Sequence, residues 1–324
     1  MVLTYFWEGP ASGMARKLRV EYPSAIYHLM NRGDRREPIF RDDQDRERFL
    51  TTLGQTCAKT DWQVHAFCLM PNHFHLVVET PRANLVAGMK WFLGTYTARF
   101  NRRHKLFGHL FSGRYKSLIV EGSGEGYLKT VCDYVHLNPV RARLLAPRAA
   151  LQTYRWSSYP LYLQRLARRP AWLRVDRLLG EWGVPLDSAA GRRRFAAEVE
   201  ARRQGELDEE FKPVRRGWCL GSKDFRKELL EQIAAQQSGW HYGEELVESA
   251  HERARGLIQA ALGRKGWTVQ ELKTRRKGDA FKVRLAAQLR AQTTVTAAWI
   301  AQELHMGTRG HLTHLLYHRT RPTS

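Results

Sequence analysis

Two histidines separated by one residue, His73 and His75, stand at the start of an apolar stretch that reads as a turn and a short strand. In a strand, residues i and i+2 point to the same face. The two imidazoles would therefore project together, while Phe74 points the other way into a core. Two neutral imidazoles on one face can bind a metal ion. Pairs at this spacing also occur where no metal binds, so the spacing alone leaves the metal interpretation open.

A second pair of polar residues, Tyr134 and Asn138, is spaced four residues apart in an expected helix and so shares one helix face. The amide oxygen of Asn138 is a hard ligand suited to Mg²⁺ or Mn²⁺, and with His73 and His75 it would complete a three-ligand site. The phenol of Tyr134 could then reach a phosphate held by the metal and attack it. A helix tyrosine is more commonly a packing residue, and on chemistry alone three other tyrosines are rival nucleophiles: Tyr96, Tyr115 and Tyr127.

The elements that must position these residues follow from periodicity, caps and breakers. They are a strand at 24–30, a helix from 42 or 43 to 58, strands at 62–69 and 73–80, a helix at 84–103, a strand at 115–121 and a helix at 125–138 ended by Pro139. This β-α-β-β-α-β-α order predicts an α+β fold, the ferredoxin-like split βαβ plan with an antiparallel sheet and helices packed on one face.

The chain has 324 residues, a formal net charge of +21 and a pI of about 10.2. Such an excess of Lys and Arg predicts a polyanionic partner, most simply nucleic acid, although a basic soluble protein or a membrane-surface protein would share it. No long apolar segment predicts a membrane span. The four cysteines form no CxxC pair, which fits a reducing cytoplasm. We expect a cytoplasmic, nucleoid-associated protein with no membrane partner and no small-molecule cofactor.

Beyond about residue 165 the strand patterns stop and Arg and Glu dominate. We expect a leader at 1–13, a catalytic domain at 14–160, a basic helical region at 161–265 and a last region at 266–324. Helices near 279–293, 298–304 and 309–317, with a turn at 305–308, are typical of a helix-turn-helix. An ordinary helical hairpin is the alternative. In the helix-turn-helix interpretation, the residues facing a DNA groove are Arg309, His311, Thr313 and His314.

These motifs together resemble the single-tyrosine transposases of the HUH superfamily, and most closely the REP-associated tyrosine transposases. The resemblance covers about residues 14–160 in order. It is carried by MARKLRVEYP (14–23), YHLMNRG (27–33), MPNHFHL (70–76), GRYKS (113–117), DYVHLNPVRA (133–142) and WSS (156–158). Short members of that family end near residue 160, whereas longer relatives carry a helical tail with a helix-turn-helix, which this tail resembles.

The resemblance implies metal ligands at His73, His75 and Asn138, a nucleophile at Tyr134, and Mg²⁺ or Mn²⁺ as the cofactor. It implies DNA contacts by the basic motif residues Arg114, Lys116 and Arg141. The implied activity is cleavage and rejoining of single-stranded DNA at REP-like hairpins through a 5′-phosphotyrosine, by a monomer or a homodimer. Two alternatives stay open, a DNA-binding regulator that has lost the chemistry and an RNA-binding protein.

Overall fold

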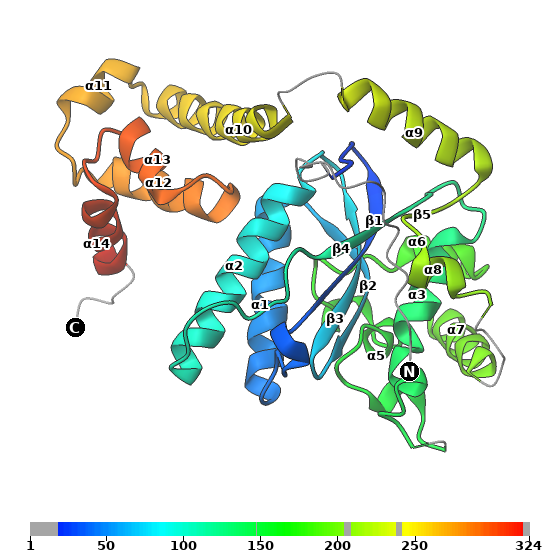
Figure 1. Cartoon of the computed structure of the whole chain (residues 1–324). Helices are drawn as coiled ribbons and strands as arrows, with labels where there is room; N and C mark the ends of the chain where they lie inside the picture. The colour runs from blue at the N-terminus through cyan, green and yellow to red at the C-terminus, as the bar shows by residue number, and fades with distance from the viewer. Residues whose placement is uncertain (1–18, 147, 204–208, 238–241, 320–324) are drawn as a thin grey trace.

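The computed structural model describes residues 19–319 except 147, 204–208 and 238–241, so the predicted leader at 1–13 lies outside the described residues. Its centre is a five-stranded sheet in the order β2-β3-β1-β4-β5 (Figure 1). The strands are β1 (Ala25–Arg32), β2 (Gln63–Met70), β3 (His73–Thr80), β4 (Lys116–Val120) and β5 (Cys219–Leu220).

Strands β1 to β4 pair antiparallel, in the order that the split βαβ plan predicts. In the central pair, Arg32 lies opposite His73 and Ala25 lies opposite Thr80. The short β5 was not predicted, and it runs parallel to β4 at the edge of the sheet. The α+β class and the antiparallel sheet predicted from the sequence are thus confirmed.

Two helices, α1 (Asp43–Thr60) and α2 (Leu85–His104), cover one face of the sheet (Figure 1). Helix α1 begins where the sequence predicts, because the Asp42 carboxylate accepts the backbone N–H of Asp45 at 3.0 Å as an N-cap. Phe74 packs here, with its ring centroid 5.1 Å from that of Phe49 on α1 and 6.2 Å from that of Phe92 on α2. Phe74 therefore points to the face covered by α1 and α2, and His73 and His75 point to the opposite face.

That other face is also covered by helices, which the sequence did not predict (Figure 1). Phe195 and Phe211, far along the chain, are fully buried in the same core as the sheet. This core extends to Leu229, so the segment that follows residue 160 packs on the sheet. The helical elements that follow β4 in this part of the chain, before and after residue 160, are α3 (Tyr127–His136), α4 (Asn138–Arg141), η2 (Leu151–Thr153), α5 (Tyr159–Tyr162), η3 (Leu166–Arg168), α6 (Asp176–Glu181), α7 (Ala189–Arg202), α8 (Lys212–Arg216) and α9 (Lys223–Gln237). The short η1 (Asp34–Arg36) follows β1.

A second, separate core begins at Ala254 and includes Leu312. Its centre contains the fully buried Lys282, whose ammonium donates to the carbonyls of Leu272 (2.8 Å) and His305 (3.1 Å) and so ties the ends of two helices together. The helices are α10 (Tyr242–Lys265), α11 (Val269–Thr274), α12 (Ala280–Gln292), α13 (Ala297–Glu303) and α14 (Arg309–Arg319). The division into domains stays a prediction, and the two cores separate between Leu229 and Ala254.

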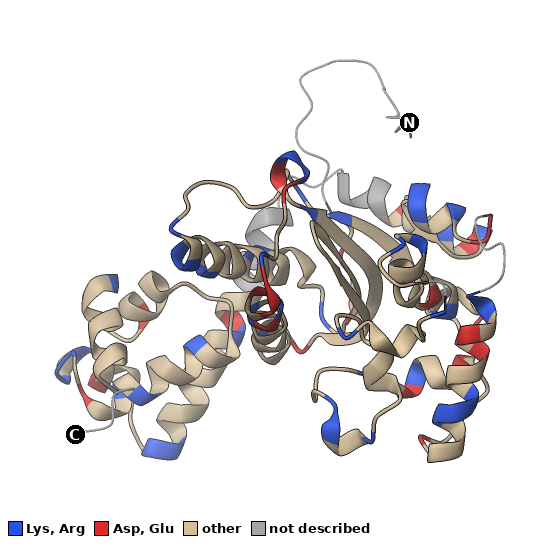
Figure 2. Cartoon of the chain, turned by 90° about the horizontal axis from the view of Figure 1, so that it is seen from below, with Lys and Arg blue, Asp and Glu red and all other residues tan. Residues whose placement is uncertain are grey.

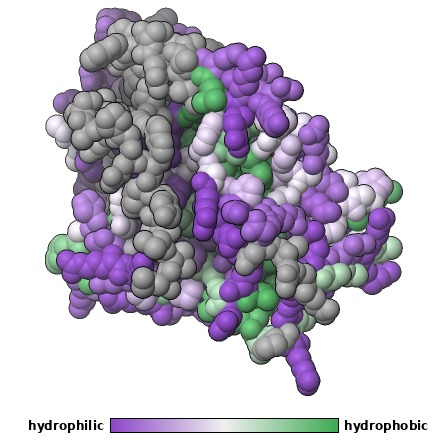
Figure 3. Space-filling model, turned by 45° about the vertical axis from the view of Figure 1, so that its right-hand side comes forward, coloured by the Kyte–Doolittle hydropathy of each residue, from purple (hydrophilic) through white to green (hydrophobic). Residues whose placement is uncertain are grey.

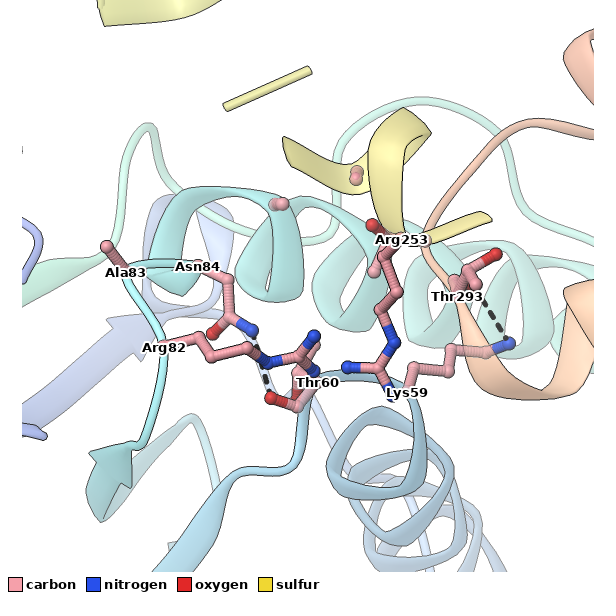
Figure 4. Close-up of a pocket in the computed structure, with 10 residues that line it drawn as sticks. Lys59, Thr60, Arg82, Ala83, Asn84, Arg253 and Thr293 are labelled. Carbon is pink, nitrogen blue, oxygen red and sulfur yellow. Dashed lines mark hydrogen bonds between the residues drawn. The ribbon is translucent and has the colours of Figure 1, made fainter. Parts of the chain in front are cut away.

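The C-terminal helices dock against the end of α1 through polar contacts. Lys59 donates to the carbonyls of Arg290 and Thr293, and burial lowers the pKa of Lys59 to about 8. Asp61 pairs with both Arg82 (2.6 Å) and Arg253 (2.9 Å). The side chains of Lys59, Arg82 and Arg253 converge around a cavity of about 200 Å³ at this junction (Figure 4). The joint is therefore polar and basic, unlike the apolar cores on either side of it.

Lys and Arg residues are spread over the helices of both cores rather than confined to one of them (Figure 2). On the face drawn in Figure 3, hydrophilic residues predominate and hydrophobic ones are exposed in small patches. Within the described residues, no helix is both long enough and apolar enough to cross a bilayer. The positive charge of the chain is therefore distributed over both cores.

Candidate active site

The predicted histidine pair lies at the start of β3 and faces the sheet side covered by α3. The ring centroids of His73 and His75 are 5.1 Å apart at 82°. The Nδ1 atom of His73 lies 2.7 Å from the amide oxygen of Asn72. Because that oxygen can only accept, Nδ1 carries the proton and Nε2 keeps its lone pair. Burial lowers the pKa of His73 to about 4, so the ring is neutral at pH 7.

A third histidine, His28 on β1, completes the group. Its Nε2 lies 2.9 Å from Nδ1 of His75, and the two rings stack with centroids 5.1 Å apart. Burial lowers the pKa of His28 to about 4 and holds the pKa of His75 well below its ordinary value. The sequence analysis did not select His28 as a site residue. His28 and Met30 are two residues apart in β1 and so share one face, and Met30 lies opposite His75. This spacing is the signal that could have identified His28 as a site residue.

Tyr134 on α3 packs against His28 and His75. Its ring centroid is 5.6 Å from the ring of His28 and 5.6 Å from the ring of His75, edge-on to both. The side chain is 9% exposed, so the phenol is nearly enclosed. The structure thus brings Tyr134 together with His75, which lies 59 residues earlier in the chain, and with His28, which lies 106 residues earlier.

Arg141 and Phe211 enclose Tyr134 further. The guanidinium carbon of Arg141 is 5.0 Å from the centroid of the tyrosine ring. The Phe211 ring is 5.5 Å from the same ring, and Arg141 is 5.4 Å from Phe211. Phe211 precedes α8 and has no sequence signal that links it to the site. A positive charge beside the phenol favours negative charge that develops there or on a neighbouring phosphate.

The helix that carries Tyr134 is shorter than predicted, and this changes the setting of Asn138. Helix α3 ends at His136, and Asn138 begins the separate turn α4. The reason is Pro139, which has no N–H to continue the helical ladder. Asn138 is buried one turn beyond Tyr134, so the two residues are near in the chain as predicted but belong to consecutive helices.

An ion pair between Asp133 and Arg202 links α3 to α7. Arg202 Nε on α7 lies 2.9 Å from Asp133 Oδ2 on α3, and Asp133 is fully buried. Burial raises the pKa of Asp133 to about 7, an effect that Arg202 and then Lys129 oppose. The residue next to Tyr134 is therefore held by an element from beyond residue 160.

The predicted DNA contacts fall in three places. Arg114 and Lys116 are exposed at the start of β4, whereas Arg141 lies against Tyr134. Arg309, His311, Thr313 and His314 are exposed on α14 in the second core. The predicted turn before that helix is present, with His305 and Gly307 in left-handed conformations. The helices α12 to α14 have the predicted order, while DNA binding by them stays a prediction.

The three predicted ligands, His73, His75 and Asn138, are neutral side chains, a donor set that would hold a divalent cation only weakly. The described residues contain no group of three His, Cys, Asp or Glu side chains able to hold a metal ion. However, Nδ1 of His73 donates to Asn72, which leaves Nε2 of that ring for a metal. Nε2 of His75 is left for a metal in the tautomer whose Nδ1 donates to His28. With an amide oxygen from Asn138, such a site carries no protein charge. It therefore suits a cation that takes oxygen ligands from a phosphate as well.

Acid should destabilise this fold because its buried histidines resist protonation. Burial lowers the pKa of His28 to about 4 and that of His136 to about 3, whereas both are near 6.5 in an unfolded chain. The unfolded state then binds more protons, so stability present above pH 6.5 is lost as the pH falls toward 4, by up to about 3 kcal/mol for each histidine. Urea unfolding at pH 7.5, 6 and 5 measures this loss.

The exposed His109 provides the matched control for that experiment. His109→Gln should keep the wild-type slope of unfolding free energy against pH, whereas His136→Gln should flatten it. A wild-type stability that does not change between pH 7.5 and 5 would contradict the assignment of these histidines as neutral.

Comparison with known proteins finds a match for the region that contains the candidate site. Residues 21–138 match a family model described as "Transposase IS200 like". Among solved structures, one described as "Structure of the REP associates tyrosine transposase bound to a REP hairpin" matches with a TM-score of 0.39 and 12% identity, over 49% of this chain and 91% of that chain. No curated protein matches. Residues 21–138, which contain His28, the histidine pair, Tyr134 and Asn138, are therefore similar to the IS200-like transposases.

Proposed function

We propose that the protein is a metal-dependent tyrosine transposase that cleaves and rejoins single-stranded DNA at hairpin sites. REP-like palindromes are the proposed targets. The observation that carries the proposal is the position of the Tyr134 ring, 5.6 Å from the rings of both His28 and His75. A phenol set against neutral imidazoles and beside a guanidinium is suited to attack on a phosphate rather than to packing alone.

In this reaction the Tyr134 oxygen attacks the phosphorus of one phosphodiester. A bond forms between that oxygen and the 5′ phosphate, and the bond from phosphorus to the 3′ oxygen breaks. The phenol gives up one proton and the leaving 3′ oxygen takes one up. Arg141 lies where it can stabilise charge on the phosphate. A Mg²⁺ or Mn²⁺ ion held by His73, His75 and Asn138 would neutralise phosphate charge in the transition state.

The proposed reaction predicts which end of the cut DNA strand becomes bound to the protein, and end-labelled DNA tests this. A hairpin oligonucleotide is labelled at its 3′ end in one reaction and at its 5′ end in another, with Mn²⁺ or with EDTA. The 3′ label should move with the protein on a denaturing gel, and the 5′ label should appear on a shorter free strand. Both products should vanish in EDTA. A 5′ label on the protein, or an adduct that forms in EDTA, would contradict the proposed chemistry.

The alternative function, a regulator that binds repeated palindromes without chemistry, predicts a different result in the same experiment. It predicts retarded hairpin DNA on a native gel and no covalent adduct under any metal condition. No described residue of the candidate site favours it, because the histidines, Tyr134 and Asn138 are all present.

His28 should act as a positioning residue for His75. If its Nε2 accepts the proton of His75 Nδ1, it fixes the tautomer that leaves Nε2 of His75 free for metal. His28→Ala is expected to weaken Mn²⁺ binding, measured by calorimetry, by roughly 10- to 100-fold. His28→Gln, which retains an acceptor, should lose less. Wild-type Mn²⁺ affinity in a folded His28→Ala protein would show that His28 does not orient the ligand.

A further inference from the structure

Phe107 is a large apolar side chain that is 97% exposed. It lies in the loop between α2 and β4, next to Leu106, which is 38% exposed. Burying a phenyl ring normally stabilises a fold by a substantial amount, so a fully exposed one contributes almost nothing to this fold. The packing of the chain therefore gives this ring no role.

The loop is held rigidly around that ring. The N–H of Leu106 donates to the carbonyl of Asn101 at 2.9 Å, and the Asn101 side-chain amide donates to the carbonyl of Gly108 at 3.0 Å. Gly108 has a φ of +86°, a conformation that glycine adopts without strain. These bonds clamp the backbone on both sides of Phe107. The ring is thus presented outward by a fixed turn, not by a loose segment.

The same loop lies at the end of the sheet where His73 is found. Phe111 forms a β-bridge with Gly33, and the N–H of Ser112 donates to the carbonyl of Arg32 at 2.9 Å. Arg32 is the strand partner of His73. The loop and the candidate site therefore meet at the same end of the sheet, but Phe111 packs on Phe74, on the sheet face opposite to the histidines.

Positive charge surrounds this end of the sheet. Seven exposed cations lie on the loop, on the last turn of α2 and on the adjoining β1–η1 segment: Arg32, Arg35, Arg36, Arg102, Lys105, Arg114 and Lys116. Asp34 and Glu37 are the exposed acids of the same segments. An exposed aromatic ring within an excess of positive charge is the combination with which proteins bind single strands: cations follow the phosphates and the ring stacks on a base.

We propose that Phe107 stacks on an unpaired nucleobase of single-stranded DNA next to the hairpin. This inference rests on the proposed function, because it concerns the same DNA, but it concerns binding and not cleavage. Stacking on a phenyl ring tolerates any base, so the contact would select an unpaired flank over a duplex without reading its sequence. The substrate would then need a single-stranded flank that reaches from the site to the loop.

The test measures binding alone, in EDTA, so that no strand is cut. The full-length protein is titrated into a hairpin oligonucleotide with unpaired flanks, which carries 2-aminopurine at one flank position at a time. Wild type is expected to change the fluorescence strongly at one position. Phe107→Ala should abolish that change and weaken binding of the flanked hairpin by about 10-fold, while Phe107→Trp should keep both.

A blunt hairpin and a second exposed residue provide the controls. Phe107→Ala should bind the blunt hairpin as wild type does, and Leu166→Ala, which removes a side chain 73% exposed on η3, should change neither substrate. Equal binding of the flanked hairpin by wild type and Phe107→Ala, or equal losses on both hairpins, would overturn the inference. So would a change from dimer to monomer in Phe107→Ala without a change in flank binding. Adduct formation, assayed separately in Mn²⁺, tests the proposed function independently.

Discussion

Replacing Tyr134 by Phe is expected to abolish the covalent protein–DNA adduct while leaving DNA binding nearly intact. The substitution removes only the phenolic oxygen, so the ring should keep its contacts with His28, His75 and Phe211. Loss of a nucleophile removes the covalent step itself, and the adduct yield should fall by several orders of magnitude. Affinity should change by no more than about 3-fold, because the basic surface supplies most of it.

The rival tyrosines make this a discriminating experiment. Tyr96 lies between the sheet and the helices of the Phe74 face, where its hydroxyl donates to the carbonyl of Ile39 at 2.6 Å. Tyr115 stacks under Arg19, and burial raises the pKa of Tyr115 to about 12. Tyr127 begins the same helix as Tyr134, two turns away. We expect Tyr115→Phe and Tyr127→Phe to form adduct at the wild-type level.

The measurement is the denaturing-gel adduct assay with a 3′-labelled hairpin, followed by peptide mapping of the modified residue. Anisotropy with the same hairpin in EDTA gives the affinity, and thermal unfolding shows that Tyr134→Phe is folded. An adduct from Tyr134→Phe, or a modified peptide that contains a different tyrosine, would assign the nucleophile elsewhere.

Local patterns in the sequence predicted the parts of the site that local forces determine. The strand at 73–80 has the predicted bounds, because its alternation and the Pro71-Asn72 turn fix its register. Asp42 caps α1 as predicted, since a cap depends on a few adjacent residues. The placement of Phe74 and the histidines on opposite faces follows from the same alternation, and it holds in the structure.

The residues that sequence reasoning missed reach the site through long-range packing. Phe211 contacts Tyr134 across 77 residues of chain, and Arg202 pairs with Asp133 from a helix whose composition indicates a solvated surface. Strand β5 has two residues, too few to show any periodicity. His28 was visible in a strand, but its partnership with His75 depends on strand register, which one strand alone does not reveal.

The second large effect is expected from shortening the chain at two points. A protein that ends at residue 165 should not fold into a stable monomer. It would lose Phe195 and Phe211 from the core, the β5 pairing of β4, and Arg202 opposite Asp133. Removing one partner of a buried ion pair typically costs about 3–5 kcal/mol, before the loss of apolar packing is added. That sum is comparable with the whole stability of a typical domain.

A protein that ends at residue 237 should instead fold and form the adduct. This cut falls between the two cores, and it removes α12 from the end of α1 together with the contacts of Lys59 and Arg253. The Asp61–Arg253 pair is partly exposed, and the buried Lys59 regains solvent when its partners are removed, so their loss should lower stability by only about 1 kcal/mol. The affinity for DNA should fall, with a shallower dependence on salt, because cations of α14 are removed.

Thermal unfolding, gel filtration and the adduct assay on both shortened proteins separate two views of the segment 166–229. If the protein that ends at 165 is monomeric and forms adduct as well as the longer one, the helices packed over Tyr134 are dispensable. If only the longer protein is active, those helices form the wall against which the nucleophile is held. We expect the second result, because the Tyr134 ring contacts Phe211 of that segment as well as His28 and His75. A tyrosine without that wall would keep its chemistry but lose its fixed position, which a near-attack geometry requires.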